Sequence, residues 1–183
     1  YWTTTVLTRI NKDNFSFVLD YAKEQNHLAN FQLLYTHGSF LDRHFHPSSL
    51  PELSLNHEEA KTLLKKLKQL KKQGEPVGGS MGFFDHLINW PDLTKSYSEK
   101  TVKGADCMAG KLYYYLDTDG CLYPCGDSIG RVEGISLKNN SLKKGVVKAG
   151  KIPCNSCIIA CNVEQNLLFS FNLRTILNWI RKV

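Results

Sequence analysis

The stretch that decides the fold of the second half of the chain is CMAGKLYYYLDTDGCLYPC, residues Cys107–Cys125. At its centre, Asp117–Gly120 separates two runs rich in aromatic residues. A glycine at the end of such a turn accepts the positive φ that a tight hairpin needs. The sequence therefore predicts a β-hairpin between Lys111–Tyr115 and Leu122–Tyr123, with a cysteine near either end.

All six cysteines of the chain lie in this second half, and three of them form the string CNSCIIAC, residues Cys154–Cys161. A CxxC pair lets two sulfurs reach one metal centre without stretching the backbone. Thiols clustered at turns therefore favour a metal site over disulfide bonds, which are typical of short secreted chains, and over scattered structural cysteines. Spacing alone leaves zinc and iron–sulfur open, although a zinc ribbon pairs two CxxC knuckles and this chain has one.

The same residues resemble the twitch and SPASM domains, the auxiliary-cluster regions of radical S-adenosylmethionine (SAM) enzymes. The pattern in those domains is a cysteine, a hairpin whose turn carries a glycine, and a cysteine five positions beyond that glycine. Cys107, Gly120 and Cys125 match it. Cys154–Cys161 resembles their second cysteine group, and Cys161–Asn166 before an apolar helix resembles their ending, so the resemblance covers about residues 104–183.

The resemblance implies one auxiliary [4Fe–4S] cluster, because the second cysteine group is shorter than in a full SPASM domain and no further cysteine follows it. The candidate ligands are Cys107, Cys125, Cys154, Cys157 and Cys161. We expect the first two to act with the CxxC pair, while Cys121, inside the turn, is expected to be a bystander. The backbone amides of Gly110, Gly126 and Gly130 are expected to approach the cluster sulfurs.

The first half shows a βαβ-type alternation, which predicts a parallel sheet. Strands are expected at Thr3–Ile10, Phe31–Tyr35 and Pro76–Ser80, too few to close a barrel. The expected fold class is therefore α/β: the closing βα units of a radical SAM-type partial barrel over residues 1–93, then a small α+β cluster-binding domain with a β-hairpin over residues 94–183.

A helix is predicted from the N-cap Asn56 to about Gln73, before Gly74. It carries six lysines and contributes much of the formal net charge of +6. Leucines are spaced between them as one apolar stripe. Because no aromatic residue interleaves with the lysines, we expect a solvated helix face rather than a nucleic-acid or partner surface.

Polar residues of the first half offer two further candidate sites. The resemblance places Asn11 and Asn14 near SAM, at a strand end where barrels carry functional residues. A strand terminus and a helix N-cap explain these two residues equally well. One loop is rich in histidine, and its possible metal ligands are Asp42, His37, His44 and His46. We expect this loop to be solvated rather than to bind metal.

The C-x3-C-x2-C motif that holds the SAM-cleaving cluster is missing, since Ser128 and Glu164 stand where a third cysteine would complete it. The expected function is thus the C-terminal portion of a radical SAM enzyme, with no catalytic activity of its own. Its complete form would use SAM, act on a peptide or small molecule, and take electrons from a ferredoxin or flavodoxin in the cytoplasm.

The longest apolar runs are far shorter than a membrane span, so no membrane association is expected. The alternative function is a non-enzymatic zinc-binding module with a basic partner-binding surface. A third possibility is a degenerate scaffold that binds nothing.

Overall fold

The computed structural model describes residues 2–34, 50–102, 105–150 and 154–180. It is a mixed α/β structure, and within those residues the strands form three small sheets and no closed barrel. A parallel pair joins β1 (Trp2–Leu7) to β2 (Leu28–Leu33), and an antiparallel pair joins β3 (Tyr97–Ser98) to β7 (Ser156–Cys157). An antiparallel sheet contains β4 (Tyr115–Leu116), β5 (Cys121–Tyr123) and β6 (Ile135–Ser136).

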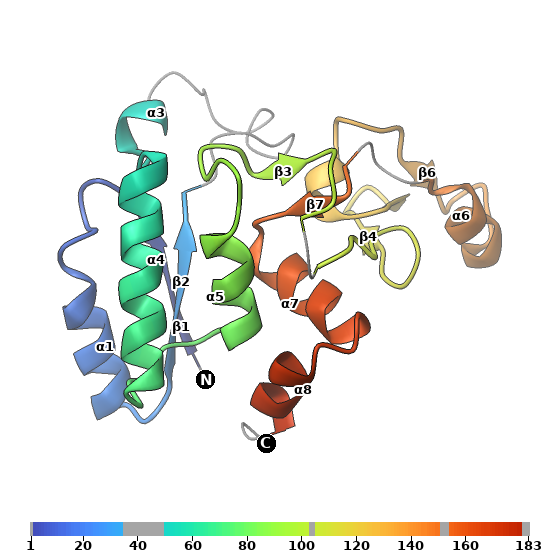
Figure 1. Cartoon of the computed structure of the whole chain (residues 1–183). Helices are drawn as coiled ribbons and strands as arrows, with labels where there is room; N and C mark the ends of the chain where they lie inside the picture. The colour runs from blue at the N-terminus through green and yellow to red at the C-terminus, as the bar shows by residue number, and fades with distance from the viewer. Residues whose placement is uncertain (1, 35–49, 103–104, 151–153, 181–183) are drawn as a thin grey trace.

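Helices cover one side of the first sheet and continue between the sheets (Figure 1). They are α1 (Phe15–Glu24), α3 (Leu50–Leu53), α4 (His57–Lys72), α5 (Met81–Ile88), α6 (Leu142–Lys148), α7 (Ala160–Phe169) and α8 (Leu173–Ile180). A 3-10 turn, η1, spans Gly126–Ser128. In the described ranges, no helix has the length and apolar character needed to cross a bilayer.

The parallel pair β1–β2 has one covered face and one open face. Leu7, Phe31 and Leu33 are buried against the helices. On the opposite face of β1, Trp2 is 70% exposed and Val6 is 43% exposed. Parallel strands are normally covered on both faces, so the open face of β1 is an unusual surface.

The third strand expected at Pro76–Ser80 is reduced to one parallel bridge between Val77 and Ala29. Gly79 follows with φ +77, which leaves extended geometry, and Ser80 then caps α5 by accepting a hydrogen bond from the backbone of Phe83. The segment therefore turns into a helix after one bridged residue.

The predicted lysine-rich helix is confirmed as α4, and its start is fixed by a capping box. The Asn56 side chain accepts from the Glu59 amide at 2.9 Å, and the Glu59 carboxylate accepts from the Asn56 amide at 3.0 Å. Lys12 adds an ion pair to Glu59 at 2.6 Å, which ties the β1–α1 turn to this helix end. Leu63, Leu64 and Leu67 are buried, as the apolar stripe predicts.

Both sides of the predicted boundary at residues 93 and 94 contribute to the main hydrophobic core. Leu64 and Phe84 from the first half pack in one cluster with Ile158, Val163 and Leu167 from the second. Helix α7 contacts α5, and α5 in turn contacts α4. The cysteine-rich half is thus joined to the first half through a common apolar layer.

The capping box gives a direct stability prediction. Replacing Asn56 with Ala removes the acceptor for the Glu59 amide, and we expect a loss of about 1 kcal/mol in the free energy of unfolding. Asn14→Ala is the matched control, because Asn14 precedes α1 but makes no side-chain capping hydrogen bond. Urea denaturation of both variants checks this. Equal losses in the two variants would contradict the assigned role of the capping box.

Candidate metal centre

The predicted hairpin is confirmed, and it separates two of the cysteines. The Asp117 amide donates to the Cys121 carbonyl at 2.9 Å, and Gly120 has φ +81. The first strand is shorter than expected, because the Leu112 amide donates to the Met108 carbonyl at 2.9 Å and folds that segment into a turn. Cys107 therefore lies before a turn, and Cys125 follows β5 after Pro124.

The pairing of β3 with β7 brings the second cysteine group to the first (Figure 1). Tyr97 pairs with Cys157 in this antiparallel ladder. The amide of Cys107 then donates to the Asn155 carbonyl at 3.0 Å, inside the CxxC loop. Segments far apart in the sequence are thus joined by backbone hydrogen bonds next to their cysteines.

Four cysteines, Cys107, Cys125, Cys154 and Cys157, gather around this junction. Cys125, Cys154 and Cys157 are 4%, 7% and 8% exposed, and Cys107 is half-buried. Burial raises the pKa of Cys157 above its usual value, and the charges of the other three thiols raise it further. Cys125 and Cys154 lie in one buried cluster with Ala109, and Cys107 packs against it. Cys157 pairs with Tyr97, which packs against the same cluster.

The thiols are held in an environment that opposes ionisation. Burial raises the pKa of Cys154 to about 12 and also raises the pKa of Cys125. Without a bound cation these thiols stay protonated at neutral pH, because desolvation penalises the thiolate. A metal centre would supply the positive charge that ionisation needs.

Backbone amides partly oppose the effect of burial. The amides of Asp127 and Ser128 lower the pKa of Cys125 through hydrogen bonds, and the Ile159 amide does the same for Cys157. The Gly110 amide, which we expected to approach a sulfur, bonds to the Tyr113 carbonyl instead. The same expectation for Gly126 and Gly130 stays a prediction. Amide hydrogen bonds of this kind stabilise cluster thiolates and adjust cluster potentials.

Within the described residues, no group of three or more His, Cys, Asp or Glu side chains is arranged so that it could hold a metal ion. Zinc, with Zn–S distances of about 2.3 Å, and an iron–sulfur cluster both take thiolate ligands. The choice between them is therefore a question for chemical analysis of the protein.

The remaining two thiols lie elsewhere, and all six cysteines are free of disulfide bonds. Cys161 is exposed in the first turn of α7, with its sulfur 3.8 Å from the Asn162 side chain. Cys121 lies in β5, where burial and Asp119 raise its pKa. Neither is among the main charges acting on Cys125, Cys154 and Cys157.

Asn11 has a clear structural role in the turn after β1. Its side-chain oxygen accepts from the Thr8 amide at 2.8 Å, and its side-chain nitrogen donates to the Val6 carbonyl at 2.8 Å. Asn14 is exposed at the start of α1. Proximity of either residue to SAM stays a prediction.

The histidine-rich loop, with Asp42, His37, His44 and His46, lies outside the described residues.

Sequence reasoning missed two residues that support the cysteine site. Asn166 of α7 is 1% exposed, and its side-chain oxygen accepts from the Met108 amide at 2.9 Å and from the Tyr113 hydroxyl at 3.2 Å. Burial raises the pKa of Tyr113, and the charges of three of the four gathered thiols add to the effect. In the sequence, Tyr113 was marked only by its place in the aromatic run, and Asn166 only by its place in the Cys161–Asn166 segment.

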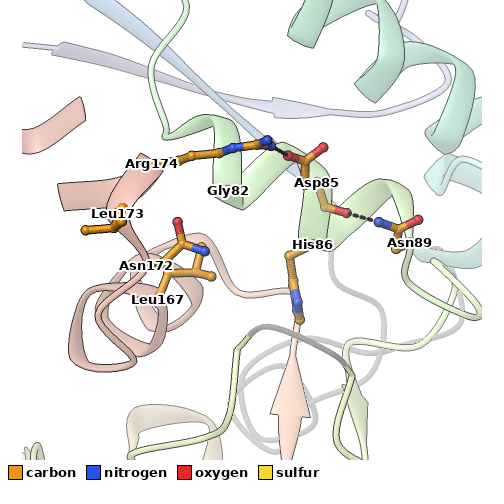
Figure 2. A pocket seen from close by; sticks show the side chains of 8 residues that line it. All are labelled: Gly82, Asp85, His86, Asn89, Leu167, Asn172, Leu173 and Arg174. Atoms are coloured by element: carbon orange, nitrogen blue, oxygen red, sulfur yellow. Dashed lines mark hydrogen bonds and ion pairs between the residues drawn. The ribbon is translucent and has the colours of Figure 1, made fainter. Parts of the chain in front are cut away.

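A third missed residue, His86, connects the site to a cavity of about 330 Å³ beside α5 and the α7–α8 corner (Figure 2). Its Nε2 lies 2.9 Å from the Cys157 carbonyl, which can only accept, so Nε2 donates and Nδ1 carries the lone pair. Burial lowers the pKa of His86, and Nδ1 has no hydrogen-bond partner.

At the other end of the cavity Arg174 pairs with Asp85 at 3.2 Å. None of the lining residues is a cysteine, so the cavity is separate from the four thiols.

No protein-family model, curated protein or solved structure matches this chain.

The role of Asn166 can be tested by its removal. Asn166→Ala leaves the Met108 amide and the Tyr113 hydroxyl without their buried acceptor, so we expect a loss of about 1–3 kcal/mol in the free energy of unfolding. Gln165→Ala is the control, because Gln165 is exposed on the same helix. Urea denaturation of both variants gives the comparison. A loss no larger than that of the control would show that the two contacts do not stabilise the fold.

Proposed function

We propose that the chain is the C-terminal portion of a radical SAM enzyme and binds one auxiliary [4Fe–4S] cluster through Cys107, Cys125, Cys154 and Cys157. The observation that carries the proposal is the arrangement of these four thiols, which come from two distant segments. Cys125 and Cys154 share one buried cluster, Cys107 packs against it, and Cys157 pairs with Tyr97, which packs against the same cluster. The order of the cysteines around the hairpin supports it as well.

The energetics of the thiols add support for a resident cofactor. Cys125 and Cys154, two buried thiols with raised pKa values, contribute little as a structural core, since they form only a small cluster with Ala109 and a few partly buried neighbours. Ligation by iron would convert them to thiolates and cross-link the hairpin to the β7 segment. This is the arrangement expected where metal binding and folding are coupled.

A bound auxiliary cluster would supply one-electron chemistry or an open iron position for substrate. The chain's own residues would hold it in place. The amides of Asp127, Ser128 and Ile159 would donate to ligand sulfurs, and Asn166 would fix the loop that carries Cys107. His86 would hold the backbone of Cys157 through its carbonyl.

The first half is compatible with the closing strands of a partial barrel. Its parallel pair is covered by helices on one face, and the opposite face carries Thr4 and the exposed Trp2 and Val6. In a barrel this opposite face would point to the interior, where the proposed substrate, a peptide or small molecule, would bind. An electron donor such as a ferredoxin or flavodoxin belongs to the same proposal.

Iron and sulfide analysis after anaerobic purification tests the proposal. We expect about four irons per chain and a broad absorbance near roughly 400 nm, as for other thiolate-bound [4Fe–4S] clusters. Serine substitution of Cys107, Cys125, Cys154 or Cys157 should remove most of the iron. Cys121→Ser and Cys161→Ser are the matched controls, and both should retain it.

Two outcomes would reject the assignment. A colourless protein that contains one zinc per chain would favour the zinc-binding module. Iron that is lost from Cys161→Ser but kept in Cys154→Ser would show that the ligand set is wrong.

A further inference from the structure

Arg131 places a half-buried positive charge at the edge of the cysteine site. It follows η1, where its amide donates to the Ser128 carbonyl at 3.0 Å and completes a tight turn directly after Cys125. Its side chain is only 16% exposed, although arginine is rarely buried without a partner. A single arginine in a glycine-rich loop forms no sequence pattern, so the sequence did not single it out.

Two contacts hold the guanidinium. It lies over the ring of Tyr97, 4.0 Å from the centroid, and Tyr97 itself packs on the cysteine core. Its Nη1 is 3.5 Å from the Asp127 carboxylate, which is an ion-pair distance. That Nη1 is buried and has no hydrogen-bond partner. The stacked ring and the carboxylate fix the orientation of the group while leaving one donor unused.

The guanidinium lies beside the proposed ligands. The Tyr97 ring beneath it packs against the cluster of Ala109, Cys125 and Cys154, as does Val132, the next residue along the chain. Tyr97 also pairs with Cys157 across β3 and β7. Asp127 lies in η1, whose N-cap is Cys125. The site therefore has a fixed cation and a fixed anion at its edge.

Fixed charges of this kind change the energy of adding an electron. A [4Fe–4S] cluster with four thiolate ligands is anionic, and reduction makes it more so. A buried cation nearby favours the reduced form, and a buried anion disfavours it, because both interact with the cluster through a low dielectric. A guanidinium hydrogen bond to a cluster sulfur acts in the same direction as the positive charge.

We propose that Arg131 is a positioning residue that raises the reduction potential of the proposed auxiliary cluster, with Asp127 acting in the opposite direction. This inference rests on the proposed function. In the redox step the cluster gains one electron from its one-electron donor, no bond forms or breaks, and Arg131 keeps its proton throughout.

The experiment is a redox titration followed by electron paramagnetic resonance on anaerobically prepared, cluster-loaded protein. Arg131→Gln removes the cation, and we expect its reduction potential to be more negative than that of the unmodified chain. Asp127→Asn removes the anion, and we expect its potential to be more positive. A general loosening of the site would move both variants in the same direction, so opposite shifts identify the electrostatic effect.

Two further variants serve as controls. Arg131→Lys keeps the charge but loses the planar stack, so its potential should lie closer to that of the unmodified chain than that of Arg131→Gln. Lys23→Gln removes the same unit of charge from an ion pair with Glu75 in the first half, and it should leave the potential unchanged. An equal shift in Lys23→Gln would reduce the effect to net charge and overturn the inference.

The outcomes separate this inference from the proposed function. If the unmodified chain carries no cluster, both fail. If it carries one and Arg131→Gln has an unchanged or higher potential, the inference alone is overturned. Should Arg131→Gln lose its iron, Asp127→Asn decides: a more positive potential supports the inference, and any other result overturns it.

Discussion

The pairing of β3 with β7 is the constraint on which the second half of the structure depends. The two strands contribute two residues each, and between them the chain forms the hairpin, the 3-10 turn and α6. Closing so long a loop costs conformational entropy, and the pairing of two residues on each strand offsets only a small part of that cost. Hydrogen bonds from Cys107 to Asn155 and from Asn155 to Ser98 extend the contact. The four thiols lie around this junction, where a cross-link would limit the freedom of the unfolded chain most.

Local signals in the sequence were sufficient for the elements that local chemistry determines. Asn56 starts α4 because its side chain caps the first turn, and Gly74 ends it because its φ is positive. Neither effect needs a contact with the rest of the fold. Asp117–Gly120 gives the hairpin for a similar reason. The strand expected at Pro76–Ser80 does not form at its predicted length, because strand length depends on a pairing partner. The two glycines before Ser80 also favour the turn into α5.

The candidate site was predictable only as a set of cysteines. Spacing suggested five ligands, but it could not show that Cys161 lies on the exposed side of a helix, because the start of α7 depends on packing of Val163 and Leu167. The residues around the thiols, Asn166, His86 and Arg131, come from three distant elements. A polar residue without a periodic pattern gives no sign of its neighbours until the chain is folded.

The open edge of β1 has a consequence for how the chain behaves in solution. Among the described residues β1 pairs only with β2, so its other edge has no strand partner, although the Asn11 side chain covers the Val6 carbonyl. An uncharged, partly apolar strand edge is a template for intermolecular β-pairing. When this chain is alone, its aggregation at high concentration should therefore begin at β1, independently of the state of the cysteines.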